Sequence, residues 1–571
     1  MTDITKPTAS DPTPAAGRPL SRRQVLAAAG ALGGLAAVRG VLPAAAQDAT
    51  PAASPASGGL VAGVDYLPSP MPGVFDAFLR SPAPYPSYQG KPGNGGPVKL
   101  LSLLFGPPPP GLGDNRYWKE LNDRLGVEWD VNFVPYEQYG ERTATTLAGG
   151  DLPDLIYVNP DAGAPHLYAA MAQGAFADLT PFLTGDELKN YPNLAKIDPA
   201  VWKNISVDGK ILGVPKQVPR FDNTGFYRND WREKLGLPAP ANADDFAKMM
   251  GAFTTGDPDG NGTADTWGLA GASGNWNLIN GGYLGRMFRV PNNWVVTDGK
   301  LVNAVETEEY KNAVAYARKL HDAGVYHPDT AGMTFEQEEA ALMGGQISLQ
   351  IQGFATFLGS DGLRGRIKKL NPNAQLDGLV LPGWDGGDGV TYNGAGAWGF
   401  TSVSVTAGQN PDRVRELLRI LDYLMAPFAS EEQIFLEYGD EGIHHTISPN
   451  GARVLNDLGA KEIGYFGYFP LIWVARPEPQ VFYYPDMPGE AEYAQKLAVE
   501  ILKRGIDNPT LGLFSQTMAD KSAELQQLET DRVGAIISGR ADLATLDQFV
   551  QDWRSRGGDQ MREELAKQLP S

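Results

Sequence analysis

The stretch VKLLSLLF at residues 98–105 has the pattern of a buried strand, and the fold can be inferred by working outward from it. An apolar run bounded by Gly and Pro is typical of a strand covered on both faces in a parallel sheet. A helix is predicted over 116–125, and VEWDVNFV at 127–134 alternates as a half-buried strand does. A helix over 136–147 and a strand over 155–158 continue the series. This alternation predicts an α/β lobe with a largely parallel sheet.

Two polar residues, Asn159 and Asp161, follow the third predicted strand directly. In open α/β sheets, ligands bind at the carboxyl ends of the strands. We therefore expect Asn159 and Asp161 to contact a ligand.

The N-terminal segment has the features of an export signal. SRRQVL at residues 21–26 resembles the twin-arginine export motif, and residues 25–38 form an apolar run too short to cross a bilayer. Ala44–Ala46 offers a cleavage site. The sequence predicts a twin-arginine signal peptide over 1–46 and a periplasmic or extracellular protein. A permanent N-terminal anchor is the alternative interpretation.

Composition narrows the class of protein further. Residues 47–96 are rich in Ala, Pro, Ser and Gly and are predicted to form a flexible linker. The chain has no cysteine and a net charge of −19, so disulfides, lipoprotein acylation and thiolate chemistry are excluded. Nucleic acids and anionic lipids require clustered cations, and we expect neither as a partner.

Six short segments, in order along the chain, resemble the family-one extracellular solute-binding proteins of ATP-driven sugar importers. They are GDLPDLI (150–156), QGAFADLTPF (173–182), DGKILGVP (208–215), FYRNDW (226–231), KLGLP (234–238) and IISGR (536–540). Their order and spacing cover most of the chain. The chain length and the loop at 257–265 are most similar to the long-chain, oligosaccharide-binding branch of that family.

The resemblance implies an α/β fold of the periplasmic-binding-protein type, with two lobes joined by a hinge that the chain crosses several times. The hinge crossings would fall near Gly213–Tyr227 and Leu381–Phe400, both rich in Gly and Pro. The implied division is 97–220 with 400–450 for lobe 1, and 221–399 with 451–571 for lobe 2. The implied partners are a carbohydrate ligand and an ABC permease, and the protein itself would be a monomer.

DPDGNGTAD at residues 257–265 is the sharpest local motif. Oxygen-bearing side chains at its first, third, fifth and ninth positions, with Gly at the sixth, match a calcium-binding loop. Four side chains and one backbone carbonyl would bind the ion: Asp257, Asp259, Asn261, Asp265 and the carbonyl of Thr263. A closed cage of this kind predicts a structural calcium ion. The alternative is an Asx-rich turn stabilised by its own hydrogen bonds.

Tryptophans in polar or glycine-rich segments form a second signal. A sugar ring packs its flat face on an indole while neighbouring amides and carboxylates bind its hydroxyl groups. Trp276, Trp384 and Trp398 lie in such segments and are predicted ligand contacts, although any one of them could instead pack in a core. Arg220, Asp222 and Asn223, at the first proposed hinge crossing, are predicted polar contacts, with an ordinary turn as the alternative.

Signatures of catalysis are scarce. The five histidines form no H-E-x-x-H pattern, and no nucleophile elbow or phosphate-binding loop occurs. The sequence therefore predicts a binding protein with no catalytic residues, which captures a carbohydrate for an importer. A secreted carbohydrate-active hydrolase is the alternative, since paired carboxylates can occur among the 67 acidic residues. A calcium-stabilised adhesion protein is a third interpretation.

Overall fold

The computed structural model describes residues 60–158, 167, 170–171, 173–221, 223–271, 278–279, 282–463, 474–475 and 480–569. The predicted export signal lies outside these residues, as do four predicted ligand contacts, Asn159, Asp161, Asp222 and Trp276. For Asn223 the position in a strand is described but not the side chain. No helix within the described ranges is both long enough and apolar enough to cross a membrane.

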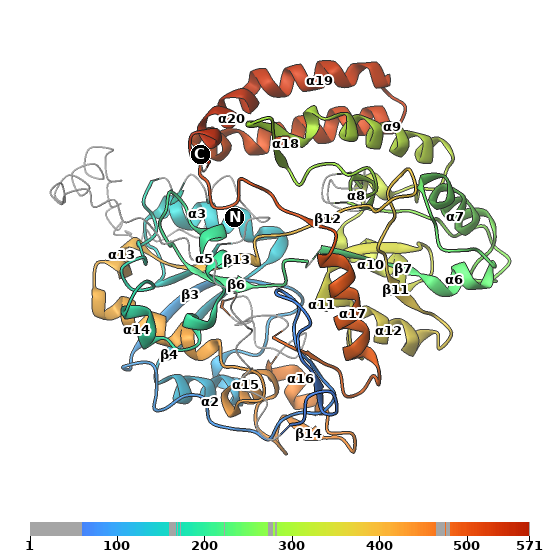
Figure 1. The fold of residues 1–571 in the computed structure, drawn as a ribbon. Coiled ribbons are helices and arrows are strands. Elements are labelled where there is room, and N and C mark those ends of the chain that lie inside the picture. Colours follow the sequence, from blue (N-terminus) through green and yellow to red (C-terminus); the bar gives the residue numbers. More distant parts are fainter. Residues whose placement is uncertain are drawn as a thin grey trace, which may run out of the picture. The chain divides into compact units, whose positions relative to one another are not determined.

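The first lobe is built on a five-stranded mixed sheet with the order β4-β3-β5-β13-β6 (Figure 1). The strands are β3 (Pro97–Leu104), β4 (Glu128–Pro135), β5 (Leu155–Val158), β6 (Val214–Gln217) and β13 (Ala397–Val403). β3 is parallel to both β4 and β5, which confirms the predicted parallel arrangement. β13 enters from far along the chain and runs antiparallel to β5 and β6.

Helices of this lobe bury their apolar faces against the sheet and one another. They are α2 (Arg116–Leu125), α3 (Tyr136–Gly149), α5 (Pro199–Ile205), α13 (Val405–Gly408), α14 (Pro411–Leu424), α15 (Glu431–Tyr438) and α16 (Asp457–Ile463). α2 coincides with its predicted range because Asn115 caps its first turn and Gly126, at φ 69°, ends it. A small hairpin, β14 (His445–Ile447) with β15 (Arg453–Leu455), precedes α16.

The second lobe contains a three-stranded antiparallel sheet with the order β10-β7-β11. Its strands are β7 (Asn223–Arg228), β10 (Leu349–Gly353) and β11 (Leu376–Gly378). Two further pairs are β8 (Trp294–Thr297) with β9 (Lys300–Asn303), and β12 (Thr391–Tyr392) with β17 (Gly505–Ile506). Together with the first lobe, this arrangement confirms the predicted α/β class.

Most helices belong to the second lobe. Those around the sheet are α6 (Asn229–Lys234), α7 (Ala243–Thr255), α8 (Tyr283–Met287), α10 (Phe335–Met343), α11 (Phe354–Phe357), α12 (Leu363–Leu370) and α17 (Glu490–Leu502). A helical layer at the top of Figure 1 contains α9 (Glu308–Asp322), α18 (Gln516–Ile537), α19 (Leu546–Trp553) and α20 (Asp559–Ala566). α9 and the C-terminal helices share one hydrophobic core.

The chain passes between the lobes at several points. It leaves the first lobe between β6 and β7 and returns between β12 and β13, inside the two stretches predicted as hinge crossings. The final passage comes later than the expected residue 451, because Ile463, Val474 and Ala475 still belong to the first lobe's core. The chain then joins the second lobe at β16 (Phe482–Tyr483).

Residues 60–96 differ from the flexible linker expected for this segment. β1 (Tyr66–Leu67) and β2 (Ala77–Phe78) form a sheet with β16, and Phe78 is 1% exposed. Further along, Glu432 of α15 accepts hydrogen bonds from the backbone N–H groups of Ser87 (2.9 Å) and Tyr88 (3.2 Å). Buried apolar side chains and paired backbone groups thus order a stretch whose composition alone is typical of a linker.

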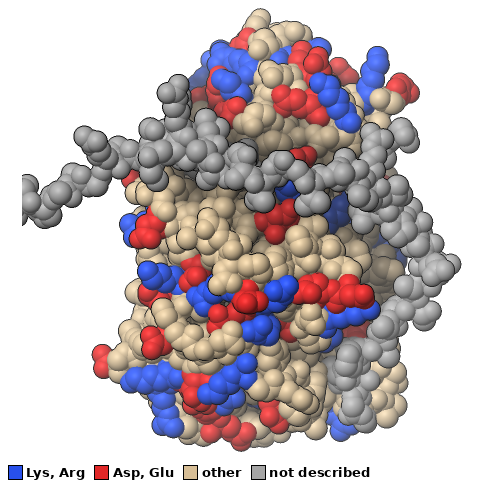
Figure 2. Space-filling view, turned by 90° about the vertical axis from the view of Figure 1, so that its left-hand side faces the viewer, with Lys and Arg blue, Asp and Glu red and all other residues tan. Residues whose placement is uncertain are grey.

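The surface carries both signs of charge. On the face drawn in Figure 2, Lys and Arg side chains are interspersed with Asp and Glu in bands, separated by uncharged areas. The net charge of −19 is therefore not concentrated into one acidic area on this face.

Candidate functional site

Three aromatic side chains gather at one edge of the first-lobe sheet. Phe105 follows β3, Tyr136 follows β4 as the first residue of α3, and Trp398 lies in β13. The ring centroids of Phe105 and Tyr136 are 4.8 Å apart, and Trp398 is 6.2 Å from Phe105 and 6.5 Å from Tyr136. The rings are inclined by only 23°, 30° and 23° to one another. We call these residues the aromatic group.

The topology explains why these rings meet. β3 and β4 are parallel, so the residues after each strand emerge at the same edge. β13 runs the other way, and Phe400 pairs with Val158, the last residue of β5. Trp398 therefore lies just beyond the carboxyl end of β5, at the same edge. All three rings are half-buried, leaving apolar surface that is not covered by the core.

A bulge in β13 fixes Trp398. The pairing of β13 with β6 shifts between Ala397 and Phe400, and Gly399 between them has φ 84°. A Cβ at Gly399 would lie 2.3 Å from the carbonyl oxygen of Val158, so only glycine fits this position. The hydroxyl of Tyr157 donates a hydrogen bond to the carbonyl of Trp398. The indole is thus held in place by the strand rather than by a loop.

Polar side chains tie together three segments near the hinge crossings. Arg220 Nη2 lies 2.5 Å from Asp507 Oδ1, which also accepts a hydrogen bond from Asn393 Nδ2 at 2.8 Å. Asn292 Nδ2 donates to the carbonyls of Asn393 (2.9 Å) and Ile506 (3.1 Å). These contacts connect the segments around residues 220, 393 and 507.

Arg220 is also close to the strand that carries Trp398. A Cβ added at Gly396 would lie 3.6 Å from Arg220 Cγ. The Nε atom of Arg220 is buried and has no hydrogen-bond acceptor among the described residues. The segment that leads into Trp398 therefore packs against an arginine whose hydrogen-bonding capacity is not fully used.

Of the eight predicted ligand contacts, Arg220 lies against Gly396, two residues before Trp398 in the sequence. Asn223 begins β7, directly after the first crossing. Trp384 contacts Phe288 and residues of α7 and α8 in the second lobe instead. Sequence reasoning missed Phe105 and Tyr136, although Phe105 ends one predicted strand and Tyr136 comes two residues after another. Asn159 was predicted as a ligand contact because it lies at the carboxyl end of a strand. The same criterion applies to Phe105 and Tyr136.

The loop from Asp257 to Asp265 follows α7 and is exposed over most of its length. Asp257 accepts hydrogen bonds from the backbone N–H groups of Gly260 (2.9 Å) and Gly262 (3.2 Å). Asn261 Nδ2 donates to Asp259 Oδ2 at 2.6 Å and to Asp265 Oδ1 at 3.1 Å. Two carboxylates thus share a single side-chain amide, while the third accepts from backbone N–H groups.

This arrangement is that of an Asx-rich turn. Thr263 donates its N–H to Asn261 Oδ1 at 2.6 Å, as in an Asx turn. Within the described ranges no group of three or more His, Cys, Asp or Glu side chains has the spacing of a metal site. Desolvation raises the pKa of Asp259, and the Asp257 and Asp265 carboxylates raise it further. The loop therefore has more negative charge than its own donors neutralise.

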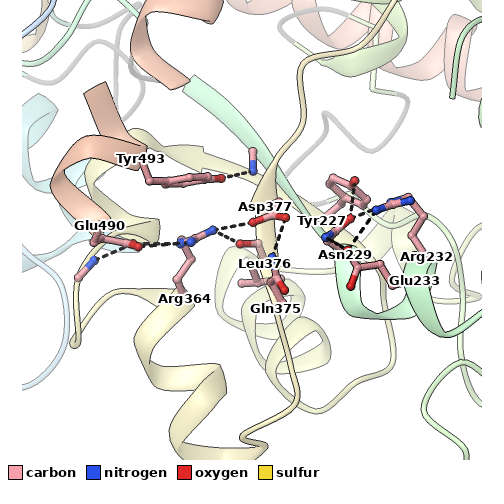
Figure 3. Close-up of polar contacts among 12 residues, drawn as sticks. Tyr227, Asn229, Arg232, Glu233, Arg364, Gln375, Leu376, Asp377, Glu490 and Tyr493 are labelled. Carbon is pink, nitrogen blue, oxygen red and sulfur yellow. Dashed lines mark hydrogen bonds and ion pairs between the residues drawn. The ribbon is translucent and has the colours of Figure 1, made fainter. Parts of the chain in front are cut away.

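The densest buried polar cluster lies elsewhere and is saturated (Figure 3). Arg364 of α12 donates to Glu490 of α17 at 2.9 Å and to Asp377 of β11 at 3.1 Å, as well as to a backbone carbonyl. Its guanidinium carbon lies 4.0 Å from the ring centroid of Tyr493, whose hydroxyl accepts a hydrogen bond from the N–H of Gly378. With its donors and acceptors matched, this cluster holds α17 onto the second lobe and leaves nothing to bind a ligand.

Comparison with known proteins adds independent information. The family model for bacterial extracellular solute-binding proteins matches residues 117–425. The polygalacturonan/rhamnogalacturonan-binding protein YtcQ of Bacillus subtilis is 26% identical over 487 residues, covering 84% of this chain and 92% of YtcQ. A fructooligosaccharide ABC transporter substrate-binding protein, FusA of Streptococcus pneumoniae, is 29% identical over 225 residues, which are 36% of this chain and 40% of FusA.

Solved structures share the fold. The alginate-binding protein AlgQ2, solved without calcium ion, matches with a TM-score of 0.61 and 16% identity, covering 84% of this chain and 98% of AlgQ2. An EF-hand mutant of FusA in complex with fructo-nystose matches with a TM-score of 0.58 and 18% identity, over 82% of this chain and 98% of FusA. At this level of identity the likeness concerns the fold, which is that of periplasmic binding proteins.

Proposed function

This chain belongs to the bacterial extracellular solute-binding proteins, and from that premise we propose that its solute is an oligosaccharide, which it delivers to an ABC importer. Membership makes it a binding protein that acts outside the cytoplasm and not an enzyme. YtcQ and FusA are both named for binding carbohydrate chains, which supports a chain of several sugar units as the ligand.

One observation carries the proposal: the half-buried aromatic group includes Trp398, and the segment just before Trp398 packs against a polar hinge cluster. Nearly parallel rings at a sheet edge present a flat apolar surface of the kind that packs on a sugar ring. Arg220, Asn393 and Asp507 in that cluster supply the donors and acceptors that hydroxyl groups require. Five further residues are proposed as ligand contacts from the sequence alone: Asn159, Asp161, Asp222, Asn223 and Trp276.

The proposed mechanism is closure of the two lobes over the ligand. The connections between β6 and β7 and between β12 and β13 are short, so few backbone dihedrals would absorb the motion. The Arg220–Asp507 contact joins the first crossing to the segment that follows β17 and would change as the hinge bends. Binding energy from stacking and hydrogen bonds would favour the closed form.

We also propose that the loop from Asp257 to Asp265 binds a structural calcium ion, as in the long-chain branch of the family. Rotating the Asn261 amide would turn Oδ1 toward Asp259 and Asp265, replacing a donor by a ligand oxygen. With Asp257 and the Thr263 carbonyl this gives the all-oxygen set that calcium prefers. The AlgQ2 and FusA descriptions, which mention calcium and an EF-hand, support the same assignment.

Export and organisation complete the proposal. Residues 1–46 would be a twin-arginine signal, and cleavage after them would release a monomer that works with a membrane permease. Replacing Arg22 and Arg23 by Lys should then leave the uncut precursor in the cytoplasm. The lobes would divide near residues 220 and 400, as expected from the sequence, with the third crossing after residue 475.

A thermal-shift screen of neutral and acidic oligosaccharides tests the function directly. The proposal expects at least one oligosaccharide to raise the melting temperature, and mass spectrometry to recover it with its chain length unchanged. Shorter products would support the hydrolase alternative. A screen in which no oligosaccharide stabilises the protein would contradict the proposal.

A further inference from the structure

Trp384 is the most exposed tryptophan among the described residues, with 49% of its surface accessible. One side of its indole packs on Phe288, with the two rings 7° from parallel and their centroids 6.2 Å apart. Since a neighbouring ring supports one face, much of the exposed area belongs to the opposite face. A large flat apolar surface is thus presented to solvent.

The backbone holds this indole rigidly. The N–H of Trp384 donates to the carbonyl of Met287 at 3.0 Å, and its carbonyl accepts from the N–H of Ala243 at 3.2 Å. The residue is therefore fixed between the end of α8 and the start of α7. Its described contacts are with the second lobe, whereas Phe105, Tyr136 and Trp398 belong to the first.

Charged groups in fixed positions border the indole. Arg289 donates two hydrogen bonds to Asp385, at 2.7 and 3.1 Å, and a third from Nε to the carbonyl of Asp388 at 2.9 Å. The Arg289 contact lowers the pKa of Asp385 to about 2, so this carboxylate is ionised at neutral pH. Asp388 is largely exposed and pairs with Arg504 at 3.3 Å.

We propose that Trp384, with Asp385 and Arg289 beside it, forms a second carbohydrate site that holds a sugar unit of a neutral polysaccharide on the protein surface. A sugar ring needs one flat apolar face and nearby hydrogen-bonding groups, and both are present in fixed geometry. Asp385 and Asp388 are each paired with an arginine, so this rim has no excess positive charge to attract a uronate chain, and the ligand is neutral.

A protein partner fits this surface less well. No other large apolar side chain is exposed in α7, in α8 or in the turn from 381 to 389, all of which are described. A specific protein interface needs an apolar patch far larger than one indole. One isolated ring with a charged rim suits a single sugar unit.

Affinity electrophoresis in gels that contain a soluble β-glucan, a galactomannan or polygalacturonate tests this site. The proposal expects a neutral polysaccharide to retard the protein, and the Trp384→Ala variant to bind it about two- to tenfold more weakly, the range for losing one aromatic contact. Trp384→Phe should retain most of the retardation. The same comparison in a Trp398→Ala background removes the contribution of the main site, and retardation should still depend on Trp384.

Several results would overturn the proposal. They are no retardation by either neutral polymer, stronger retardation by polygalacturonate, or retardation lost with Trp398→Ala but unaffected by Trp384→Ala. Calorimetry with a short oligosaccharide on the same samples separates this site from the main one. Trp384→Ala should leave that affinity unchanged, with a melting temperature equal to wild type. An equal loss of short-oligosaccharide affinity would place Trp384 in the main site and contradict the inference.

Discussion

The second lobe contains two polar clusters, one around Arg364 and one from Asp257 to Asp265. They differ in how many of their hydrogen-bonding and charged groups have partners within the protein. Arg364 is 7% exposed, and its guanidinium faces two carboxylates and a backbone carbonyl. In the loop, three carboxylates share one side-chain amide and a few backbone N–H groups in an exposed position. A matched cluster stabilises the fold, whereas a cluster with excess acceptors can be completed only by something from outside.

The same distinction separates binding residues from core residues elsewhere. Trp129 and Trp231 are fully buried, whereas Trp398 and Trp384 leave part of an indole uncovered. Apolar side-chain surface that remains exposed after folding is therefore a better guide to function than the density of polar or aromatic side chains.

The largest expected effect comes from removing the positive charge of the cluster around Arg364. Arg364→Met removes the cation from Glu490, which is itself 5% exposed, and leaves a buried carboxylate with only the Gly359 N–H, at 3.4 Å, as a hydrogen-bond partner. We expect the free energy of unfolding to fall by about 3–5 kcal/mol, measured by urea denaturation. Arg318→Met, which breaks an exposed pair with Asp322, is the control and should cost less than about 1 kcal/mol. Equal losses in the two variants would mean that the cluster is not matched as described.

Calcium should stabilise the folded protein by binding the loop from Asp257 to Asp265. At a concentration a hundredfold above its dissociation constant, calcium should stabilise the protein by about 2.7 kcal/mol, and chelation should reverse this. Asp259→Asn should abolish the response, while Asp298→Asn, in another exposed turn, should keep it. Magnesium should act poorly because it requires stricter octahedral geometry. Superimposable melting curves with calcium and with chelator would show that the loop is only a turn.

The pair formed by Glu338 and Gln350 is buried like the first cluster but has no cation, and it leads to a prediction about pH. Glu338 is 4% exposed, and it accepts a hydrogen bond from the neutral amide of Gln350 at 3.4 Å. Desolvation raises the pKa of this carboxyl from 4.5 to about 7. The folded state therefore binds more protons than the unfolded state between these values, so stability should decrease as pH rises through this window.

Between pH 5 and pH 8 we expect a decrease of the order of 2 kcal/mol that is specific to this carboxyl. Denaturation curves of wild type and Glu338→Gln should show it as a difference, because the amide cannot ionise. If the two proteins have parallel pH dependences, the buried carboxyl does not titrate in this window.

The smallest effect should come from the Arg220–Asp507 pair. Its chemistry is that of Arg364 with Glu490, but Asp507 is mostly exposed, with 65% of its side chain accessible. Asp507→Asn should therefore change the free energy of unfolding by no more than about 1 kcal/mol. A loss as large as that of Arg364→Met would show that the hinge contact, and not burial, dominates stability.

Much of the fold could be predicted because its signals are local. The strands at 98–105, 127–134 and 155–158 and the helix at 116–125 each carry their own periodicity or caps, and the structure agrees to within a few residues. The position of β13 in the first sheet depends on pairing across more than 200 residues, which no local pattern encodes. The order in residues 60–96 depends likewise on distant partners such as Glu432.

The candidate site could be predicted only in part, for a related reason. Trp398 could be predicted because it is an aromatic residue in a glycine-rich segment. The glycines are explained by the bulge in β13, where Gly399 has a positive φ. Phe105 and Tyr136 follow strands and look like ordinary core residues until the parallel pairing brings them together. For Trp384 the sequence predicted a ligand contact, but the lobe on which the indole lies depends on tertiary contacts.

Calorimetry of wild type, Trp398→Ala and Trp267→Ala with the oligosaccharide found by the stability screen tests the central claim most directly. Trp267 is a half-buried tryptophan of the second lobe that packs on His327 and serves as the matched control. The account predicts that Trp398→Ala weakens binding by about 1–3 kcal/mol, that Trp267→Ala leaves it unchanged, and that the ligand is recovered intact. Equal affinities for all three proteins, or a shortened ligand, would contradict it.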